Sequence, residues 1–348
     1  MRKGNGSIVV YDPDYGNPYG KELALLLSDG LDVRYAGALS GWRPEAIHTL
    51  SGHKFSRDGH SRISILWSYF SVLVAVILRA ILGDTIILVW CRGAADRYLF
   101  RMCAKFNLRI VYVVHNPKSR RPESRLLARS ERGLRENARL VIHSDRLRHL
   151  LEDPTLESRV MVVPHLPYSQ YVAHHKTINE HRRAGHRVLF LGQLRPDKSP
   201  MEMADFLRVV PRDFDGEFVF CGRGQLTPEI RNAAEGLMLV DRMDSRGVDD
   251  HLLTAEVTNA DVLVAPYRQV TQSGSVVLAL SFGVPVAAYS AGALPDLVDD
   301  RCLVPLGDSQ RLFEVVRGLL AEGVRVEMPD VNVWRNETLS AWMKALVD

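Results

Sequence analysis

Two short loops in the second half of the chain carry side chains suited to binding a diphosphate. The first loop follows the apolar segment 187–191 and contains Gly192, Arg195 and Lys198. Arginine offers a planar fork of donors and lysine a compact positive charge, and both groups fit phosphate oxygens. The alternative is that Arg195 and Lys198 are solvated loop charges without a ligand.

The second loop has the sequence TQSGS at residues 271–275 and precedes the apolar segment 276–282, which we predict to be a helix. A helix N-terminus presents unpaired N–H groups and a partial positive charge, so anions bind there. Gly274 would let a phosphate approach the backbone closely. The alternative is an ordinary N-cap formed by Ser273 or Ser275. We favour the anion site, because capping alone does not explain the cationic loop in the same half.

Candidates for acid–base chemistry lie in the first half of the chain. Asp12 and Asp14 flank a turn after the first apolar segment, and either carboxylate could deprotonate an acceptor hydroxyl. The alternative is that both residues only form the turn. His165 lies at the junction of the two halves, where it could meet donor or acceptor.

Parallel strands would bring these loops to one edge of a sheet. Apolar, β-branched segments alternate with helical patterns, and such segments are typical of strands buried on both faces of a parallel sheet. The predicted strands are residues 7–11, 84–90, 108–114, 139–143 and 159–163, then 187–191, 216–221, 236–240, 260–265, 284–289 and 301–304. The pattern predicts two Rossmann-like, doubly wound α/β domains, with ligands beyond the carboxyl ends of the strands.

A polar, histidine-rich segment at residues 172–186 interrupts this alternation and is the predicted linker. We therefore expect one domain at residues 1–172 and a second at 173–328. A C-terminal helix is expected within residues 329–348, where Trp and Leu recur at near-helical spacing.

The composition disfavours several classes of protein. With 348 residues, a formal net charge of +3, 46% hydrophobic and 24% charged residues, the chain fits two soluble globular domains and gives no general case for nucleic-acid binding. The four cysteines form no C-x-x-C pair, so neither a zinc site nor a disulfide framework is expected, and a reducing compartment fits best. The loop after the first predicted strand, residues 12–19, lacks the G-x-G-x-x-G pattern of nicotinamide dehydrogenases, and the sequence contains no P-loop pattern.

Two segments raise the question of a membrane. Residues 63–82 are apolar and approach the length of a bilayer span, but several serines and Arg79 interrupt them. We expect a helix buried against a sheet; the alternatives are a helix with one face on a membrane and a true span. Residues 118–148 are rich in arginine, which suits either a solvated helix face or contact with anionic lipid headgroups. No aromatic residues interleave with these arginines, which disfavours nucleic acid.

The loops also resemble a known family. The chain is similar to the nucleotide-sugar-dependent glycosyltransferases of the GT-B fold, in particular the family 4-like branch. The matching segments are LFLGQLRPDKSP (189–200), FCGRGQ (220–225), ADVLVAPY (260–267), SGSVVLALSFGVPVAA (273–288), GALPDLV (292–298), VYVVHNP (111–117) and VVPHLPYSQY (162–171). The resemblance implies two Rossmann-like domains facing a central cleft, with the donor in the second domain, the acceptor in the first, and a final helix that crosses back to the first.

The resemblance assigns roles by position. The implied donor-binding residues are Gly192, Arg195, Lys198, Gly222, Arg223, Tyr267, Gln272, Ser273, Gly274 and Ser275. The implied catalytic candidate is His115, which stands at the position of the sugar-contacting or catalytic histidine; the alternative is a loop histidine whose hydrogen bonds the backbone satisfies. Asp14 and Asp12, proposed above from the residues themselves, complete the catalytic candidates. Acceptor binding is expected from Gly16, Asn17 and His165. No metal or cofactor is expected, because cations and a helix dipole would stabilise the departing nucleoside diphosphate.

The chain departs from the family at two places. The usual pair of glutamates spaced E-x7-E falls on Val270 and Leu278, which cannot hydrogen-bond a ribose or a sugar, and the usual Gly-Arg of the first loop is Gly192-Gln193. Branches with the pattern S-G-x-x-x-x-A, found here at residues 273–279, also resemble glycosyltransferases. The departures leave the donor and the anomeric outcome open.

The expected function is transfer of a hexose from a nucleotide sugar to a hydroxyl group of a glycan or lipid-linked acceptor. The resemblance places such an enzyme in bacterial surface polysaccharide or glycolipid synthesis, in the cytoplasm, with contact to the inner face of an anionic membrane left open. The alternatives are a nucleotide-sugar epimerase or hydrolase, and a sugar-binding GT-B relative without catalytic activity.

Overall fold

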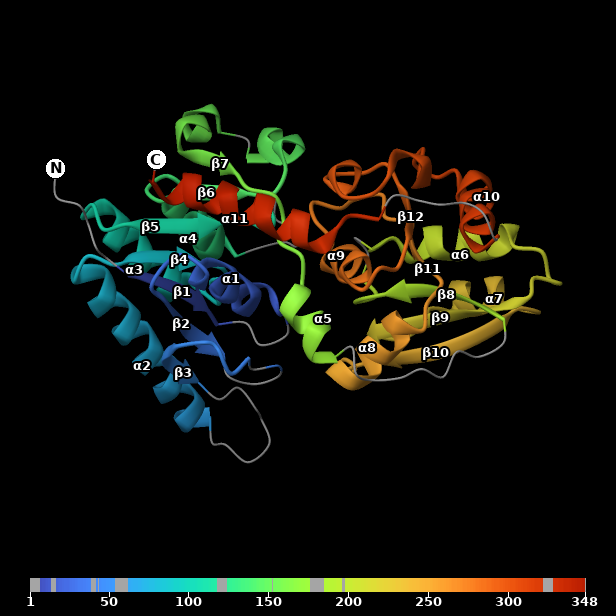
Figure 1. Ribbon diagram of the computed structural model, residues 1–348, viewed down its shortest axis with the longest axis horizontal. Helices are drawn as coiled ribbons and strands as arrows, with labels where there is room; N and C mark the ends of the chain where they lie inside the picture. Colours follow the sequence, from blue (N-terminus) through green and yellow to red (C-terminus); the bar gives the residue numbers. More distant parts are fainter. Residues whose placement is uncertain are drawn as a thin grey trace. The chain divides into compact units, whose positions relative to one another are not determined.

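A computed structural model describes residues 7–13, 17–38, 42, 44–53, 62–117, 124–151, 153–175, 185–195, 198–321 and 328–347. The chain divides into two compact units (Figure 1). The first comprises Met1–Leu166 together with Trp334–Asp348, and the second comprises Pro167–Val333.

The first unit is built on a seven-stranded parallel sheet with the order β3-β2-β1-β4-β5-β6-β7. Its strands are β1 (Ile8–Asp12), β2 (Val33–Ala38), β3 (Thr49–His53), β4 (Thr85–Leu88), β5 (Ile110–Val113), β6 (Arg139–Ile142) and β7 (Val160–Val162). Its helices are α1 (Tyr19–Ser28), α2 (Arg62–Ile81), α3 (Ala94–Lys105), α4 (Arg125–Arg135) and α11 (Val331–Val347), with 3-10 helices η1 (Asp145–Leu151) and η2 (Pro154–Arg159).

The two faces of this sheet carry different helices. Alternate residues of a strand point to opposite faces of the sheet. Because crossovers between parallel strands are right-handed, the face on which a connecting helix lies depends on which side of the first strand the next strand is added. One core cluster joins Val9, Ile86 and Ile110 to buried residues of α2, α3 and α4. Strand order reverses at β1, which lies between β2 and β4. The connection from β1 to β2 through α1 therefore runs across the sheet in the direction opposite to the connections through α3 and α4. The sheet is doubly wound, as predicted.

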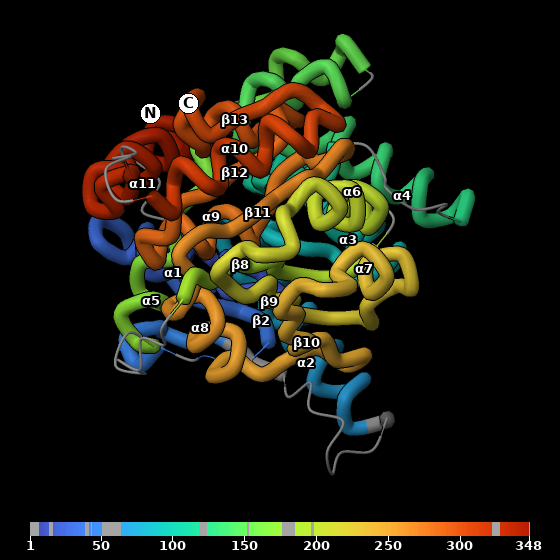
Figure 2. The backbone as a smooth tube through the Cα atoms, turned by 90° about the vertical axis from the view of Figure 1, so that its right-hand side faces the viewer, coloured from blue at the N-terminus to red at the C-terminus, as the bar shows by residue number. Residues whose placement is uncertain are grey.

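The second unit holds a six-stranded parallel sheet with the order β10-β9-β8-β11-β12-β13, and the strand labels follow this order from bottom to top in Figure 2. Its strands are β8 (His186–Leu191), β9 (Gly216–Arg223), β10 (Met238–Asp244), β11 (Val262–Ala265), β12 (Val286–Tyr289) and β13 (Leu303–Val304). Its helices are α5 (Ser169–His175), α6 (Pro200–Val209), α7 (Pro228–Ala233), α8 (Asp250–Thr258), α9 (Gly274–Ser281) and α10 (Ser309–Leu320), with 3-10 helices η4 (Leu294–Asp296) and η5 (Asp300–Cys302).

From Trp334 onward, the C-terminal helix α11 belongs to the first unit, as the resemblance implied. The indole Nε1 of Trp334 donates a hydrogen bond of 2.6 Å to the carbonyl oxygen of His165. Arg335 forms an ion pair of 2.6 Å with Asp29. Trp342 is fully buried. The last residues of the chain therefore complete the fold of the unit that contains the first residues.

The expectation of a buried helix at residues 63–82 is wrong for half of that helix. Val72, Leu73, Val76 and Ala80 of α2 pack into the core of the sheet. Apolar side chains on the opposite side are exposed to solvent, and only 22% of the window 64–81 is buried. By length and composition α2 is also the one helix in the described chain that could cross a membrane.

Candidate active site

The first two loops of the second unit are packed backbone to backbone. Gly192 follows β8 with φ of +120°, and Gly222 near the end of β9 has φ of +143°. A Cβ atom on Gly222 would lie 2.0 Å from the carbonyl oxygen of Gly192, so only glycine fits there. The Gly192 amide donates to the carbonyl of Cys221 at 2.9 Å. This contact brings the ends of β8 and β9 together.

Lys198 is the buried cation of this region, with 8% of its surface exposed. Its Nζ donates to Ser273 Oγ at 3.2 Å and lies 3.8 Å from the centre of the Tyr267 ring. The Tyr267 hydroxyl donates to the carbonyl of Leu191 at 3.3 Å, which fixes the ring under the ammonium group. The structure thus brings the two predicted loops together at Lys198.

The turn that holds Lys198 is tied to the neighbouring loop. The Lys198 amide donates to the carbonyl of the half-buried Arg195 at 2.9 Å. Ser199 follows with a left-handed φ of +52°, a conformation that costs free energy in a residue other than glycine. Its Oγ accepts a hydrogen bond of 3.1 Å from the backbone amide of Arg268. The strained residue therefore joins the loop after β8 to the loop after β11.

Helix α9 begins at Gly274, and its N-terminus is not capped by the preceding serine. Ser273 occupies the N-cap position, but its side chain makes no capping hydrogen bond. Its Oγ instead lies 3.0 Å from Ser275 Oγ and accepts from Lys198. The capping alternative for Ser273 is therefore not what the structure shows. A buried ammonium group beside the positive end of a helix dipole is an arrangement that a bound anion would stabilise.

Gln272, which precedes this turn, supplies a second sign of a ligand. Its Oε1 and Nε2 atoms are both inaccessible to solvent and make no hydrogen bond to any part of the chain that the structure describes. Buried polar atoms without a partner are rare in proteins and call for an explanation. An amide that donates to or accepts from a bound molecule would provide one.

Of the other residues predicted at the donor site, Arg223 hydrogen-bonds away from Lys198 and the turn before α9. Arg223 is exposed, and its Nε donates to the carbonyl of Ser245 at 3.2 Å, in the loop after β10. Val270 and Leu278, at the positions of the usual glutamates, are buried with 7% and 6% of their surface exposed. The part of the site that they would line is apolar.

In the first unit, three histidines follow three neighbouring strands. His115 comes after β5, His143 after β6 and His165 after β7, and all three are buried. The centroid of the His143 ring lies 5.5 Å from that of His115 and 5.0 Å from that of His165. The ring of Tyr19, at the start of α1, lies 4.8, 5.2 and 5.1 Å from His115, His143 and His165. We call these four residues the histidine cluster.

Trp90 covers the predicted catalytic histidine. Its ring stacks on that of His115 with centroids 4.0 Å apart and planes 15° apart. Trp90 follows β4, so it reaches His115 from the adjacent strand. The stacking fixes the plane of the imidazole, which is what a group that contacts a sugar or transfers a proton needs.

Burial keeps two members of the histidine cluster neutral. Desolvation lowers the pKa of His165 to about 4. Desolvation, with smaller contributions from His165 and His115, also holds the pKa of His143 well below its usual value. The Nδ1 atoms of His143 and His165 lie 2.8 Å from the carbonyl oxygens of Val163 and Leu166, so each neutral ring donates through Nδ1 and can accept through Nε2.

Asp12, from the predicted acid–base set, is fully buried, and a Cβ atom on Gly20 would lie 2.1 Å from its Oδ2. The carboxylate therefore packs against the first turn of α1, where a negative charge stabilises the helix dipole. Its role as a base stays a prediction. Asn17 Oδ1 accepts from the Tyr19 amide, the first amide of the same helix, at 2.9 Å. Asp14 and Gly16 lie outside the described residues.

Tyr19, Trp90 and His143 were missed by the sequence analysis. A signal for His143 was present, because VVH at 113–115 and VIH at 141–143 end neighbouring predicted strands in the same way. Tyr19 and Trp90 had no such signal, because only the folded sheet brings them to His115. Within the described ranges, no group of three or more His, Cys, Asp and Glu side chains is arranged to hold a metal ion.

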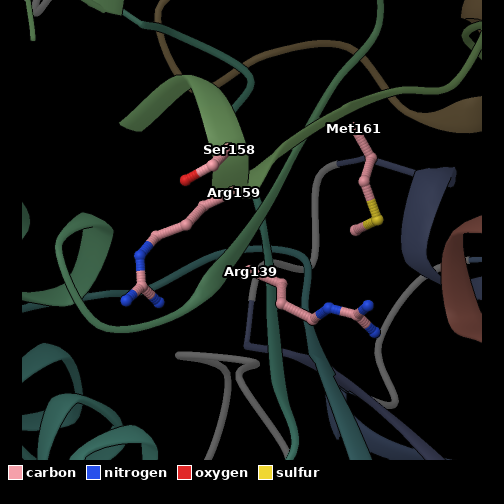
Figure 3. Close-up of a pocket in the computed structure, with 4 residues that line it drawn as sticks. All are labelled: Arg139, Ser158, Arg159 and Met161. Carbon is pink, nitrogen blue, oxygen red and sulfur yellow. The ribbon is translucent and has the colours of Figure 1, made fainter. Parts of the chain in front are cut away.

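One further hollow lies apart from these groups. It is lined by Arg139, Ser158, Arg159 and Met161, around the starts of β6 and β7 (Figure 3). The guanidinium groups of Arg139 and Arg159 point away from each other in this view, so they do not converge on one anion. The candidate groups described above instead follow the carboxyl ends of their strands, where ligands of open parallel sheets bind.

The second unit is similar in sequence to a known protein family. Residues 185–322, most of the second unit, match the model of the family described as Glycosyl transferases group 1. Over 112 residues the chain is 33% identical to 2-deoxystreptamine N-acetyl-D-glucosaminyltransferase of Streptomyces fradiae, a match that covers 31% of this chain. The same match spans about a quarter of that relative, 27% of its length.

Solved structures resemble the chain over nearly its whole length. Sucrose-phosphate synthase from Thermosynechococcus elongatus matches with a TM-score of 0.61 and 15% identity, covering 98% of this chain and 96% of that one. HepE of Anabaena in complex with UDP-glucose matches with a TM-score of 0.57 and 16% identity, covering 97% and 94%. At this identity the likeness concerns the fold, which is that of the GT-B proteins.

Proposed function

We propose that this chain, a GT-B protein whose second unit carries a group 1 glycosyl transferase domain, is a hexosyltransferase. In the proposed reaction a nucleoside diphosphate sugar gives its hexose to a hydroxyl group of a glycan or lipid-linked acceptor. The bond between C1 of the sugar and the β-phosphate oxygen breaks, and a bond between C1 and the acceptor oxygen forms. The acceptor proton goes to a base, and the nucleoside diphosphate departs.

The contact between Lys198 and the turn before α9 is the observation that carries this proposal. It gathers an ammonium group, two hydroxyl groups and the amino end of a helix within a few ångströms. The departing diphosphate gains negative charge as the glycosidic bond breaks, and fixed positive groups stabilise such charge best where water is excluded. Gly192, whose missing Cβ would meet only Ser275 at 3.6 Å, would let the diphosphate approach the backbone.

The same groups make a metal unnecessary in the proposed mechanism, and no other cofactor is invoked. Lys198 and the first amides of α9 would take the distal phosphate, Gln272 would hydrogen-bond the donor, and Arg195, Arg223 and Tyr267 would border the diphosphate and nucleoside. His115, held flat by Trp90, is the proposed contact to the sugar in the first unit. His165 and Asn17 are the proposed acceptor-side residues.

A UDP-hexose is the first donor to test. The structure of HepE contains UDP-glucose, and the relative from Streptomyces fradiae is named for transfer of N-acetylglucosamine. For the acceptor, we propose a glycan or lipid-linked intermediate of a bacterial surface polysaccharide or glycolipid. The enzyme would then work at the cytoplasmic face of a membrane, and the exposed apolar side of α2 supports that location.

A panel of nucleotide sugars, screened by thermal unfolding with a chelator present, tests the proposal. A donor at 100 times its Kd should stabilise the fold by about 2.7 kcal/mol, and the chelator should not change that shift. Incubation of that donor with candidate acceptors should then release nucleoside diphosphate and form a glycoside. If no nucleotide sugar shifts the unfolding temperature, the proposal fails. Free sugar released without an acceptor would indicate a hydrolase, and an isomerised donor an epimerase.

A further inference from the structure

Helix α2 has two apolar sides, of which the fold of the first unit uses only one. The core side consists of Val72, Leu73, Val76 and Ala80. The opposite side, which we call the outer face of α2, consists of Leu66, Trp67, Phe70, Val74, Leu78 and Ile81. The members at residues 66, 70, 74 and 78 recur every four positions, so they form one stripe along the helix.

The outer face is strongly exposed. Leu66 and Trp67 are 65% and 67% exposed, and Ile81 near the other end is 62% exposed. The stripe from Leu66 to Ile81 runs for about 22 Å at 1.5 Å per residue. Monomeric proteins in water rarely expose contiguous apolar surface on this scale unless it meets a partner. The outer face therefore needs an occupant.

Helices α3 and α4 extend this surface with apolar and basic side chains. α3 contacts both α2 and α4 on the same side of the sheet, and α2 packs along the edge strand β3 (Figure 1). Leu99 and Met102 of α3 are exposed. Lys105 of α3 and Arg125 and Arg129 of α4 are also exposed, and none of the three forms an ion pair with the described residues.

The acidic residues of these helices do not offset that charge at the surface. The basic residues of α2, α3 and α4 are Arg62, Arg79, Arg97, Arg101, Lys105, Arg125, Arg129, Arg132 and Arg135, and the acidic ones are Asp96 and Glu131. Asp96 is fully buried and accepts from the amides of Arg92 and Gly93. Glu131 is held by Arg97 and Arg135, each at 2.9 Å. The whole chain has a net charge of only +3, so positive charge is concentrated here.

We propose that the outer face of α2 lies in the interface of an anionic phospholipid bilayer, with the exposed basic residues of α3 and α4 on the lipid headgroups. A helix with an apolar stripe beside basic residues lies in the plane of the membrane, with the stripe below the headgroups. Anionic headgroups supply the charge that these helices lack. The proposal deepens the function above and rests on it only for the link to a lipid-linked acceptor.

Two other occupants fit the structure less well. A span across the bilayer would require α2 to leave the sheet, which would expose the core side and break the 2.5 Å contact of Arg79 with Asp84. A second copy of the chain, related by two-fold symmetry, would bring the same basic surface to the interface without exposed carboxylates on these helices to pair with it. An anionic lipid surface satisfies both the apolar and the basic parts.

Trp67 provides a direct readout, because the other four tryptophans are buried or half-buried. Vesicles containing anionic phosphatidylglycerol should shift the emission of the full-length protein to the blue, and lipids brominated on their acyl chains should quench it. Trp67→Phe should keep vesicle binding but lose the quenching. The protein should bind at least about fivefold more weakly to vesicles of phosphatidylcholine alone than to the anionic vesicles, and high salt should weaken binding to the anionic vesicles by a similar factor.

Matched variants separate the two parts of the surface. Phe70→Ser with Leu78→Ser should weaken vesicle binding by at least about tenfold, whereas Met201→Ser with Met238→Ser, exposed in the second unit, should not. Arg125→Gln with Arg129→Gln should weaken binding to anionic vesicles by about 30-fold at low salt. The controls Arg246→Gln and Arg317→Gln, exposed in the second unit, should leave it unchanged.

Several results would overturn the inference. They are an unquenched Trp67 in the wild-type protein, equal effects of test and control variants, or a dimer in solution that Phe70→Ser with Leu78→Ser converts to a monomer. Stabilisation by a nucleotide sugar, measured on the same proteins without vesicles, keeps the two proposals apart. Loss of vesicle binding with intact donor stabilisation refutes only the membrane surface, and the reverse result refutes only the transferase.

Discussion

Replacement of Lys198 by methionine tests the diphosphate site most directly. Methionine keeps the length of the side chain and removes its charge. The lysine is 8% exposed and its Nζ lies 3.2 Å from Ser273 Oγ, so solvent screens it weakly. Two unit charges about 4 Å apart at an effective dielectric constant of about 20 interact by about 4 kcal/mol. We therefore expect kcat/KM to fall by about 10²–10³-fold, as when a fixed donor to a developing charge is removed.

The stability of the free protein should not fall with the activity when Lys198 is replaced. The ammonium group lies beside the amino end of α9, where a positive charge is unfavourable by about 0.3–1 kcal/mol. Without donor, Lys198→Met should therefore unfold at the same or a slightly higher temperature than the wild-type protein, and the donor should stabilise it less. Lys344→Met, an exposed lysine of α11, is the matched control and should change neither quantity.

The assay is the release of nucleoside diphosphate with the donor found in the panel, together with donor-dependent thermal unfolding. A kcat/KM within about threefold of the wild-type value would refute the assignment of Lys198 to the departing phosphate. Loss of activity accompanied by a large drop in the unfolding temperature of the free protein would show instead that Lys198 is a structural residue.

Three further changes should have distinct effects. His115→Ala should lower kcat more than it changes donor affinity, measured by steady-state kinetics and donor titration; an unchanged kcat would remove His115 from the mechanism. The pKa of His165 falls from 6.5 in the unfolded chain to about 4 in the folded protein, so the unfolded chain binds a proton more readily below pH 6.5. The free energy of unfolding should therefore decline by roughly 2 kcal/mol between pH 7 and pH 5, as denaturant titrations would show. His165→Asn should reduce this dependence of the free energy of unfolding on pH. Gly222→Ala should destabilise the fold by at least about 2 kcal/mol, because its φ is +143° and its Cβ would meet the Gly192 carbonyl, whereas Gly30→Ala has open space and should be silent.

The fold was predictable from the sequence because buried parallel strands leave a local signal. Segments such as IVVY at 8–11 and VLVA at 262–265 are apolar throughout, and each lies in a central strand. The loops with Lys198 and Ser273 could be assigned to one edge for the same reason. That their side chains meet at 3.2 Å needed the tertiary structure, because 75 residues separate them.

Other features had no local signal. Residues 63–82 carry apolar side chains on two sides of the helix, so hydropathy could not distinguish a buried helix from one with an exposed apolar side. Asp12 looked like a turn residue near a site, and only the packing of Gly20 against its carboxylate shows why it is inaccessible. The stacking of Trp90 on His115 likewise depends on the order of β4 and β5 in the sheet.

The hydrogen bond from Trp334 to the carbonyl of His165 has a consequence for biosynthesis. The second unit is one continuous stretch of chain and can fold once α10 and the residues up to Val333 have left the ribosome. The first unit, although translated earlier, waits for the final helix to cover it. A nascent chain released before Trp334 would carry a finished second unit and a first unit without the Trp334 and Arg335 contacts of α11, and quality-control proteases would meet that species first.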